Sequence, residues 1–370
     1  MRDNFAYGMM RCPSELKAVG YSIKNDCIIV TSVGSLGWNY ITWYAAQQNA
    51  SQWVVFPPGR IDKLKQVSDI AVQELGIRDK SATFFMPILN DSLSKAERLK
   101  IRDYVVFSFA HNRYLICMRK NSSWHQRINQ SPDVDRKFRV EYPLKHRESW
   151  QSLLAADQVD PLSAASGDKY LIHWTRGTNG PRRGESEADY YDALTRAYSG
   201  NPRDGFNTLI QIIRSMILRG SGRMIKGAEP VISFTDANFG SVLKLIKYRN
   251  TLGHWNFEPY GIGFPQELLK SIGARCVSYG DKDEYQLLSD VEKPFYQFSQ
   301  NDAAYGTHKR NWTAESEWRL VGDLDFESII DKAVFIVPDA LEADNLYRET
   351  GDIAGLKREN IHYLTADSDT

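Results

Sequence analysis

The sequence predicts an α/β protein of two domains, a parallel-sheet domain followed by an α+β domain. The chain has 370 residues, of which 42% are hydrophobic and 25% charged, a length and composition suited to two globular domains. Its first half alternates apolar strands with helical stretches, whereas its second half has many short strands and few helices. We place the domains at residues 1–150 and 169–370, joined by a small, polar linker at 151–168.

The charges are unevenly distributed, although 46 Lys and Arg balance 46 Asp and Glu. Residues 1–150 carry 22 basic and 14 acidic side chains, a net charge of +8. Residues 151–322 carry 20 of each, and residues 323–370 carry 4 and 12, a net charge of −8. A basic half suits a nucleotide or DNA as ligand, and opposite charges at the two ends favour contact between domains or between subunits of a homo-oligomer.

The four cysteines are widely spaced, with no spacing typical of a zinc site, and we interpret them as free thiols in a reducing compartment. The first residues lack an apolar leader, and no apolar run approaches the roughly 18 residues of a membrane span. We therefore expect a cytoplasmic protein with no metal centre and no membrane partner.

The first half predicts a series of βαβ units. Apolar, β-branched or aromatic runs predict strands, and longer stretches predict helices between them. The expected strands are 27–33, 52–56, 82–87 and 114–118, and the expected helices are 39–48, 70–75 and 95–109. Gly34, Ser35 and Gly37 lie in the turn between the first strand and the first helix, where backbone N–H groups and the helix dipole can hold a phosphate. The alternative is a turn whose glycines only supply a positive φ.

Residues 25–130 resemble the SLOG superfamily, the Rossmann-like fold shared by the DNA-processing protein DprA and the LOG nucleotide hydrolases. The likeness rests on the turn at 31–37, the strand and loop at 55–59, and Arg102-Asp103 followed by Ser108 and the strand at 114–118. It implies that Gly34, Ser35 and Gly37 line a phosphate site and that Arg102 faces it. The Gly-Gly and the catalytic Glu of LOG hydrolases have no counterpart that we can place, so the resemblance implies binding or sensing of a nucleotide rather than hydrolysis. For Arg102, the alternative is a solvated position on a charge-rich helix.

The second half begins with a strand at 170–175 and a glycine-rich basic loop at 176–184. Further strands are expected at 230–235, 260–264, 274–279, 318–321 and 333–337, and helices at 206–218 and 242–248.

Three short motifs carry polar side chains on these strands. His173 and Thr175 share one face of a strand, Ser233 and Thr235 share one face of another, and Glu315 and Glu317 precede a third. A strand histidine is often only structural, and Glu-x-Glu pairs are common on surfaces. This pair, however, runs directly into an apolar strand, where a carboxylate can be half-buried.

Taken in order, these motifs resemble the ADP-ribosyltransferase fold, and the segments 231–236, 260–264 and 312–319 look like uncharacterised bacterial families linked to abortive phage resistance. The resemblance implies that NAD is the substrate and that Glu317 is the catalytic glutamate. His173 and Thr175 would hold the nicotinamide ribose or adjoining phosphate, and Ser233 and Thr235 would support the catalytic edge. Glu315 would orient or deprotonate the nucleophile, and Tyr260 would stack on nicotinamide, unless it is simply a core residue.

These resemblances predict an NAD-using ADP-ribosyltransferase or NAD glycohydrolase of an antiviral defence system, with a nucleotide-sensing or nucleic-acid-binding N-terminal domain. Two alternatives remain. One is a DNA-binding or DNA-modification component that does not use NAD, and the other is a sensor whose transferase-like domain has lost activity. We expect His173, Ser233 and Glu317 to converge if the first interpretation holds.

Overall fold

The structure is a computed structural model of the chain. It describes residues 28–33, 38–60, 62–77, 81–87, 93–110, 113–116, 134–140, 169–178, 180–196, 202–222, 225, 229–236, 246, 248–249, 254–298 and 316–364. Within these ranges, no helix has the length and apolar character that crossing a membrane requires.

The chain forms two compact units. Unit 1 comprises Met1–His146, Thr178–Arg203 and Arg249–His254, and unit 2 comprises Arg147–Gly177, Asp204–Tyr248 and Trp255–Thr370. The sequence places all of 169–370 in one domain, whereas unit 1 takes in Thr178–Arg203. The linker expected at 151–168 lies outside the described residues.

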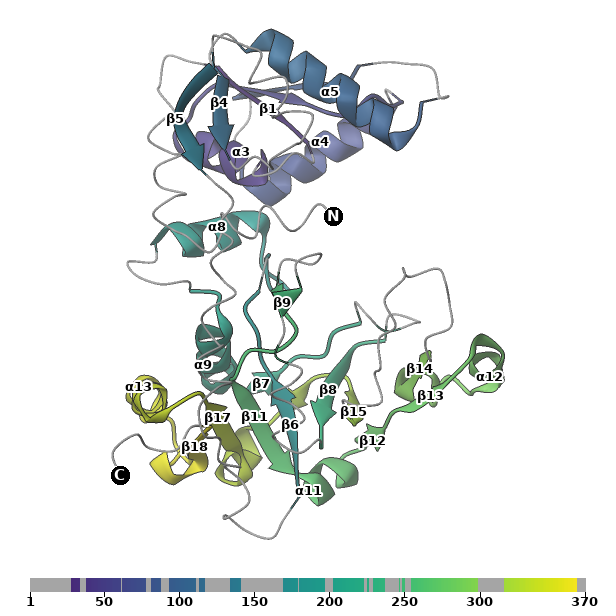
Figure 1. The fold of residues 1–370 in the computed structure, drawn as a ribbon, viewed down its shortest axis with the longest axis vertical. Helices are drawn as coiled ribbons and strands as arrows, with labels where there is room; N and C mark the ends of the chain where they lie inside the picture. Colours follow the sequence, from purple (N-terminus) through teal and green to yellow (C-terminus); the bar gives the residue numbers. More distant parts are fainter. Residues whose placement is uncertain are drawn as a thin grey trace. The chain divides into compact units, whose positions relative to one another are not determined.

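Unit 1 is built on a parallel sheet with the strand order β1-β2-β3. Helices α3 and α4 lie on one side of this sheet and α5 on the other (Figure 1). The predicted parallel α/β arrangement is therefore confirmed for these strands. The elements of unit 1 are β1 (Ile29–Ser32), α3 (Trp38–Gln47), β2 (Gln52–Val55), α4 (Asp62–Leu75), β3 (Ala82–Phe85), α5 (Lys95–Phe109), β4 (Arg113–Ile116), β5 (Val134–Val140) and α8 (Glu187–Arg196).

Local signals explain the helix ends. Ser94 and Glu97 form a capping box at the start of α5, in which each side chain accepts a hydrogen bond from the other residue's backbone N–H. Helix α4 ends at Gly76, whose φ of 61° suits glycine. It begins at Asp62, eight residues before the expected start at 70.

Strand β4 follows α5, as the expected alternation of strands and helices predicts. It pairs in parallel with β5, a strand that the sequence analysis does not predict, and in the described part of the chain this ladder is separate from the sheet of β1–β3. The expected order of elements is therefore confirmed up to β4, while the described residues do not join β4 to the parallel sheet of β1–β3.

Helix α8 is the other element of unit 1 that was not expected. Its aromatic residues Tyr190 and Tyr191 are buried against Tyr40 and Trp43 of α3, and the Tyr191 ring centroid lies 5.6 Å from that of Tyr40. Ser186 caps its first turn through reciprocal hydrogen bonds with Asp189. This Ser-x-x-Asp pattern is a helix-start signal that the sequence does contain.

Unit 2 is built on a seven-stranded mixed sheet with the order β12-β15-β8-β6-β11-β17-β18, in which only β17 and β18 pair in parallel. Its strands are β6 (Tyr170–Trp174), β7 (Ile217–Leu218), β8 (Val231–Thr235), β11 (Gly261–Pro265), β12 (Arg275–Cys276), β13 (Ser278–Gly280), β14 (Tyr296–Phe298), β15 (Glu317–Val321), β16 (Leu324–Asp325), β17 (Val334–Val337) and β18 (Ile361–Tyr363). Its helices are α9 (Gly205–Ser215), α11 (Gln266–Ser271), α12 (Lys282–Leu287), η2 (Lys293–Phe295), η5 (Glu327–Lys332), α13 (Ala340–Thr350) and η6 (Arg358–Asn360). Short strands β9 (Tyr248–Arg249) and β10 (His254–Trp255) stand where the chain passes from one unit to the other and back.

One face of the sheet in unit 2 is apolar and forms the core. Helices α9 and α13 pack on this face through Leu209, Ile213, Ala343 and Leu346 (Figure 1). The strand residues facing them are Leu171, Ile232, Phe234, Ile262, Phe264, Leu320, Phe335 and Val337. The opposite face of β8 and β15 is therefore the place for polar side chains.

Two predicted elements have different ends in the structure, and a third lies mostly outside the described residues. The helix expected at 206–218 stops at Ser215, because Met216 adopts a left-handed conformation with a φ of 54°, and Ile217 then enters β7. The strand expected at 274–279 is split at Val277, whose N–H donates to the carbonyl of Glu317, so β12 and β13 join different sheets. Most of the helix expected at 242–248 lies outside the described residues, and Tyr248 at its end lies in β9.

Candidate functional site

Three neighbouring strands of unit 2 carry the predicted residues. The sheet order β15-β8-β6 places Glu317, Ser233 and His173 on consecutive strands. In the register, Glu317 stands opposite Thr235, Arg319 stands opposite Ser233, and Thr235 stands opposite Ile172 on β6. Residues that stand directly opposite in an antiparallel pair point to the same face.

Ser233 and Glu317 make the central contact. The Ser233 hydroxyl donates a hydrogen bond of 2.7 Å to Oε1 of Glu317. The Glu317 side chain is buried apart from about a tenth of its surface, whereas Ser233 is exposed. The guanidinium of Arg319 also contacts both carboxylate oxygens of Glu317. A hydrogen-bonded, largely desolvated carboxylate is thereby fixed beside the exposed Ser233.

His173 lies on the opposite face from Ser233 and Glu317, so the expected convergence of these three side chains does not occur, and only Ser233 and Glu317 meet. Since Ile172 shares the face of Thr235, its neighbour His173 points to the other side, and the His173 ring packs at 6.1 Å from the ring of Phe234. Nδ1 of His173 lies 2.8 Å from the backbone carbonyl of Ser233. Because a carbonyl can only accept, Nδ1 carries the proton. Burial, and secondarily the charge of Arg176, lowers the pKa of His173, although its hydrogen bond to Ser233 acts in the opposite direction.

Thr175 and Tyr260 also lie away from the Ser233–Glu317 pair. Thr175 is buried, and its hydroxyl lies 3.2 Å from each of the backbone carbonyls of Gly205 and Tyr260. Tyr260 is buried beside Phe206 of α9. Burial, followed by nearby carboxylates led by that of Glu342, raises the pKa of its hydroxyl. Both residues therefore join β6 and β11 to the start of α9.

Glu258 is a buried carboxylate that the sequence analysis missed. Its two oxygens accept hydrogen bonds from the backbone N–H groups of Gly177, at 2.8 Å, and Gly205, at 3.0 Å. A Cβ at position 205 would lie within 2.8 Å of the Glu258 carboxylate, so glycine is required there. Glu258 is fully committed to this junction, and no local pattern predicts it because its partners are distant in sequence.

Unit 1 contains a separate crevice at the carboxyl ends of its parallel strands. Residues that directly follow β1 and β2 line it, namely Val33, Pro57 and Pro58. The crevice divides into two cavities of about 540 and 650 Å³ that share these three residues. In open α/β sheets, ligands bind at this edge.

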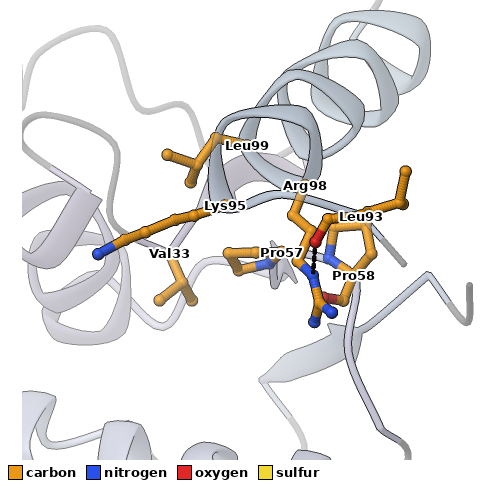
Figure 2. A pocket seen from close by; sticks show the side chains of 7 residues that line it. All are labelled: Val33, Pro57, Pro58, Leu93, Lys95, Arg98 and Leu99. Carbon is orange, nitrogen blue, oxygen red and sulfur yellow. Dashed lines mark hydrogen bonds between the residues drawn. The ribbon is translucent and has the colours of Figure 1, made fainter. Parts of the chain in front are cut away.

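The smaller cavity is flanked by the start of α5. Figure 2 shows Lys95 extending past Val33, while the guanidinium of Arg98 turns back toward the loops. Arg98 donates to the carbonyls of Leu93, at 3.1 Å, and Pro58, at 3.3 Å. Arg98 thus shapes the cavity wall by holding two loops.

The larger cavity contains charges of both signs. Arg60 and Lys63 line it together with the carboxylates of Glu74 and Glu187, the latter contributed by α8. Burial, followed by the nearby charge of Glu74, raises the pKa of Glu187, and hydrogen bonds from Asn39 and Tyr191 oppose the rise. Glu187 was not predicted, because its place in the crevice depends on α8 packing on α3.

Arg102 has a buried position in unit 1. It is 5% exposed, so the alternative of a solvated helix residue is wrong. It donates to the carbonyl of Val33 at 2.7 Å and to the carboxylate of Asp103 at 2.9 Å, which ties α5 to the end of β1. The turn residues Gly34, Ser35 and Gly37, with which we expected it to act, lie outside the described residues, as does Glu315.

In the described ranges, no group of three or more His, Cys, Asp or Glu side chains could hold a metal ion. Cys276 is a free, exposed thiol. No protein-family model matches the chain, and neither a curated protein nor a solved structure matches it.

Proposed function

We propose that unit 2 cleaves the bond between nicotinamide and ribose in NAD and transfers ADP-ribose to water or to an acceptor. The observation that carries the proposal is the hydrogen bond between Ser233 on β8 and Glu317 on the neighbouring strand β15, which fixes a largely buried carboxylate. The order of the strand motifs in the sequence supports the same assignment.

The chemistry requires a fixed anion. The glycosidic bond between C1′ of the ribose and N1 of nicotinamide breaks, its electron pair leaves with nicotinamide, and positive charge develops on the ribose. Water or an acceptor group then forms a bond to C1′ and releases a proton to solvent or to a base. An anion held beside the ribose stabilises charge that is present only in the transition state.

Each polar residue then has a role. Glu317 accepts a hydrogen bond from a ribose hydroxyl and stabilises the developing charge, and Ser233 holds Oε1 of that carboxylate. His173, neutral and on the other face, fixes the backbone of Ser233 through its carbonyl. For Glu315 we retain the role of base toward the attacking nucleophile.

A nucleotide is the second ligand we propose, at the crevice of unit 1. The support is a cavity at the carboxyl edge of a parallel sheet in which apolar walls adjoin the cations Arg60 and Lys63. The carboxylates of Glu74 and Glu187 can accept hydrogen bonds from ribose hydroxyls or a base amino group. Nucleic acid is the alternative ligand, and its binding would weaken steeply with salt.

The test follows both fragments of NAD. Wild-type protein is incubated with NAD labelled in nicotinamide and in the adenylate, with and without single-stranded DNA or nucleotides. We expect free nicotinamide, and we expect the Glu317→Gln substitution to slow its release by about 100- to 1,000-fold, because a neutral amide cannot stabilise the developing charge.

The matched control is Glu327→Gln, at an exposed carboxylate of the same unit, which should keep the wild-type rate. An adenylate label in polymer identifies transfer, and a label in free ADP-ribose identifies hydrolysis. If Glu317→Gln releases nicotinamide at the wild-type rate, or if wild-type protein releases none, the proposal fails.

A further inference from the structure

Arg319 uses all of its hydrogen-bond donors inside unit 2. The side chain is almost fully buried, on the same face of β15 as Glu317. Its five N–H groups meet five acceptor contacts, which involve Glu317 and the segment 294–297. Nε donates to Oε1 of Glu317 at 2.9 Å, Nη1 to the carbonyls of Pro294 at 2.8 Å and Tyr296 at 3.1 Å, and Nη2 to Oε1 of Gln297 at 2.7 Å and to Oε2 of Glu317 at 3.2 Å.

The contact with Glu317 is a planar two-point contact. Two nitrogens of one guanidinium face two oxygens of one carboxylate, which fixes the plane of the carboxylate as well as its position. Lysine cannot reproduce this geometry, because an ammonium is a single point of charge. The positive charge of Arg319 offsets part of the negative charge of Glu317. Arg319 therefore cannot help by making the site more negative, and its contribution is to orient the carboxylate.

The hydrogen bonds distinguish the two carboxylate oxygens. Oε1 of Glu317 accepts from both Ser233 and Arg319. In the described part of the chain, Oε2 accepts only the longer bond from Arg319. Oε2 therefore keeps the greater capacity to accept a hydrogen bond from a bound molecule.

The guanidinium is itself held from the far side. The carbonyls of Pro294 and Tyr296 and the Gln297 amide belong to η2 and β14, so the Arg319 guanidinium sits between Glu317 and this segment. A contact made from one side only would leave the long arginine side chain free to change rotamer. This arrangement removes that freedom.

We propose that Arg319 is the positioning residue of unit 2, which holds Glu317 with Oε2 directed at a ribose hydroxyl of NAD. The inference rests on the proposed function for its substrate. It adds a residue, and a carboxylate oxygen, that the sequence motifs did not single out.

The kinetic test compares Arg319→Lys and Arg319→Gln with wild-type protein. We expect kcat for nicotinamide release to fall about 100-fold in both, because a misplaced reacting group costs about that much, while KM for NAD changes little. Arg275→Lys is the matched control: Arg275 stands opposite Arg319 on β12, is exposed, and stacks over Phe295. That variant should keep the wild-type kcat.

A milder variant covers the case in which the Arg319 substitutions do not fold. Gln297→Ala removes one anchor of the guanidinium and should lower kcat by about 5-fold, a small effect because the contacts of Arg319 with Pro294, Tyr296 and Glu317 remain. Unchanged kcat in all folded variants, or a loss confined to KM, would overturn the proposal.

A structural readout separates this inference from the proposed function. Crystal structures of Arg319→Gln and Gln297→Ala should both show the Glu317 carboxylate rotated. In Arg319→Gln, Oε1 of Glu317 should also lie beyond hydrogen-bond distance of Ser233. If the carboxylate keeps its position in Arg319→Gln, Arg319 does not position it, whatever the activity. If wild-type protein releases no nicotinamide, the proposed function fails, while these structures still decide whether Arg319 holds Glu317.

Discussion

A comparison of one buried arginine from each unit, Arg102 and Arg319, shows how the same side chain is used differently. Arg102 in unit 1 pairs with its neighbour Asp103 and with the carbonyl that follows β1. Arg319 in unit 2 pairs with Glu317 and with a segment reached only through the fold. Arg102 joins a helix to a strand end, whereas Arg319 fixes a carboxylate that accepts a hydrogen bond from the exposed Ser233.

The comparison reverses the expectation from the sequence. Arg102 stands in a motif where the SLOG resemblance implies a ligand contact, yet its guanidinium bonds to the backbone of Val33 and to Asp103. Arg319 is only the last residue of the segment 312–319 in the sequence analysis, yet its guanidinium contacts the candidate catalytic carboxylate. What decides the role of a buried arginine is where its acceptors lie, and that is set by tertiary structure.

The largest effect on stability is expected from Arg102→Met. The substitution leaves the Val33 carbonyl and the half-buried Asp103 carboxylate without their donor, which should lower the free energy of opening of unit 1 by about 2–4 kcal/mol. Native-state hydrogen exchange in peptides covering β1 and α5 measures this locally.

The control is Lys100→Met, at an exposed position of the same helix, which should stay within about 0.5 kcal/mol of wild type. Equal protection in Arg102→Met and Lys100→Met would show that Arg102 does not tie α5 to β1, and would return it to the list of candidate ligand residues.

Sequence patterns predicted the strands well wherever burial produces a local signal. The β-branched and aromatic runs at β1, β2, β8 and β15 have the composition of covered strands, and the Ser94–Glu97 capping box marks the start of α5. The alternation of side chains also placed Ser233 and Thr235 on one face, and the register puts Glu317 on that face.

The remaining features depend on partners distant in sequence. Sheet order and register decide that His173 faces Phe234 rather than Glu317, and neither can be obtained from the periodicity of one strand. Glu187 reaches the crevice of unit 1 only because α8 packs on α3, and Glu258 meets two glycines that belong to other segments. Such contacts have no local sequence signature.

A smaller, pH-dependent effect is expected from His173. Its pKa lies below the usual 6.5 in the folded protein, so the unfolded chain binds more protons as the pH falls through 6.5. The stability of unit 2 should therefore be fully present above pH 6.5 and should decrease as the pH falls toward the folded pKa. Unfolding by urea at a series of pH values measures this.

His173→Asn should reduce that pH dependence, because an amide N–H can still donate to the Ser233 carbonyl but does not titrate. His362→Asn is the matched comparison, because burial also lowers the pKa of His362. His362 lies on β18, which is not next to β8 in the sheet, so this variant removes a titrating histidine without changing the contact with Ser233. A pH dependence that His173→Asn leaves unchanged would show that His173 is not held neutral against β8.

The most direct test of the central claim is the rate of nicotinamide release in a double-mutant cycle of Ser233→Ala and Glu317→Gln. If the two residues act as one unit, Ser233→Ala should slow release by about 10-fold in the wild-type background and should have no further effect when Glu317 is already glutamine. An equal loss in both backgrounds would show that Ser233 does not act through Glu317. A Glu317→Gln variant with the wild-type rate would contradict the account altogether.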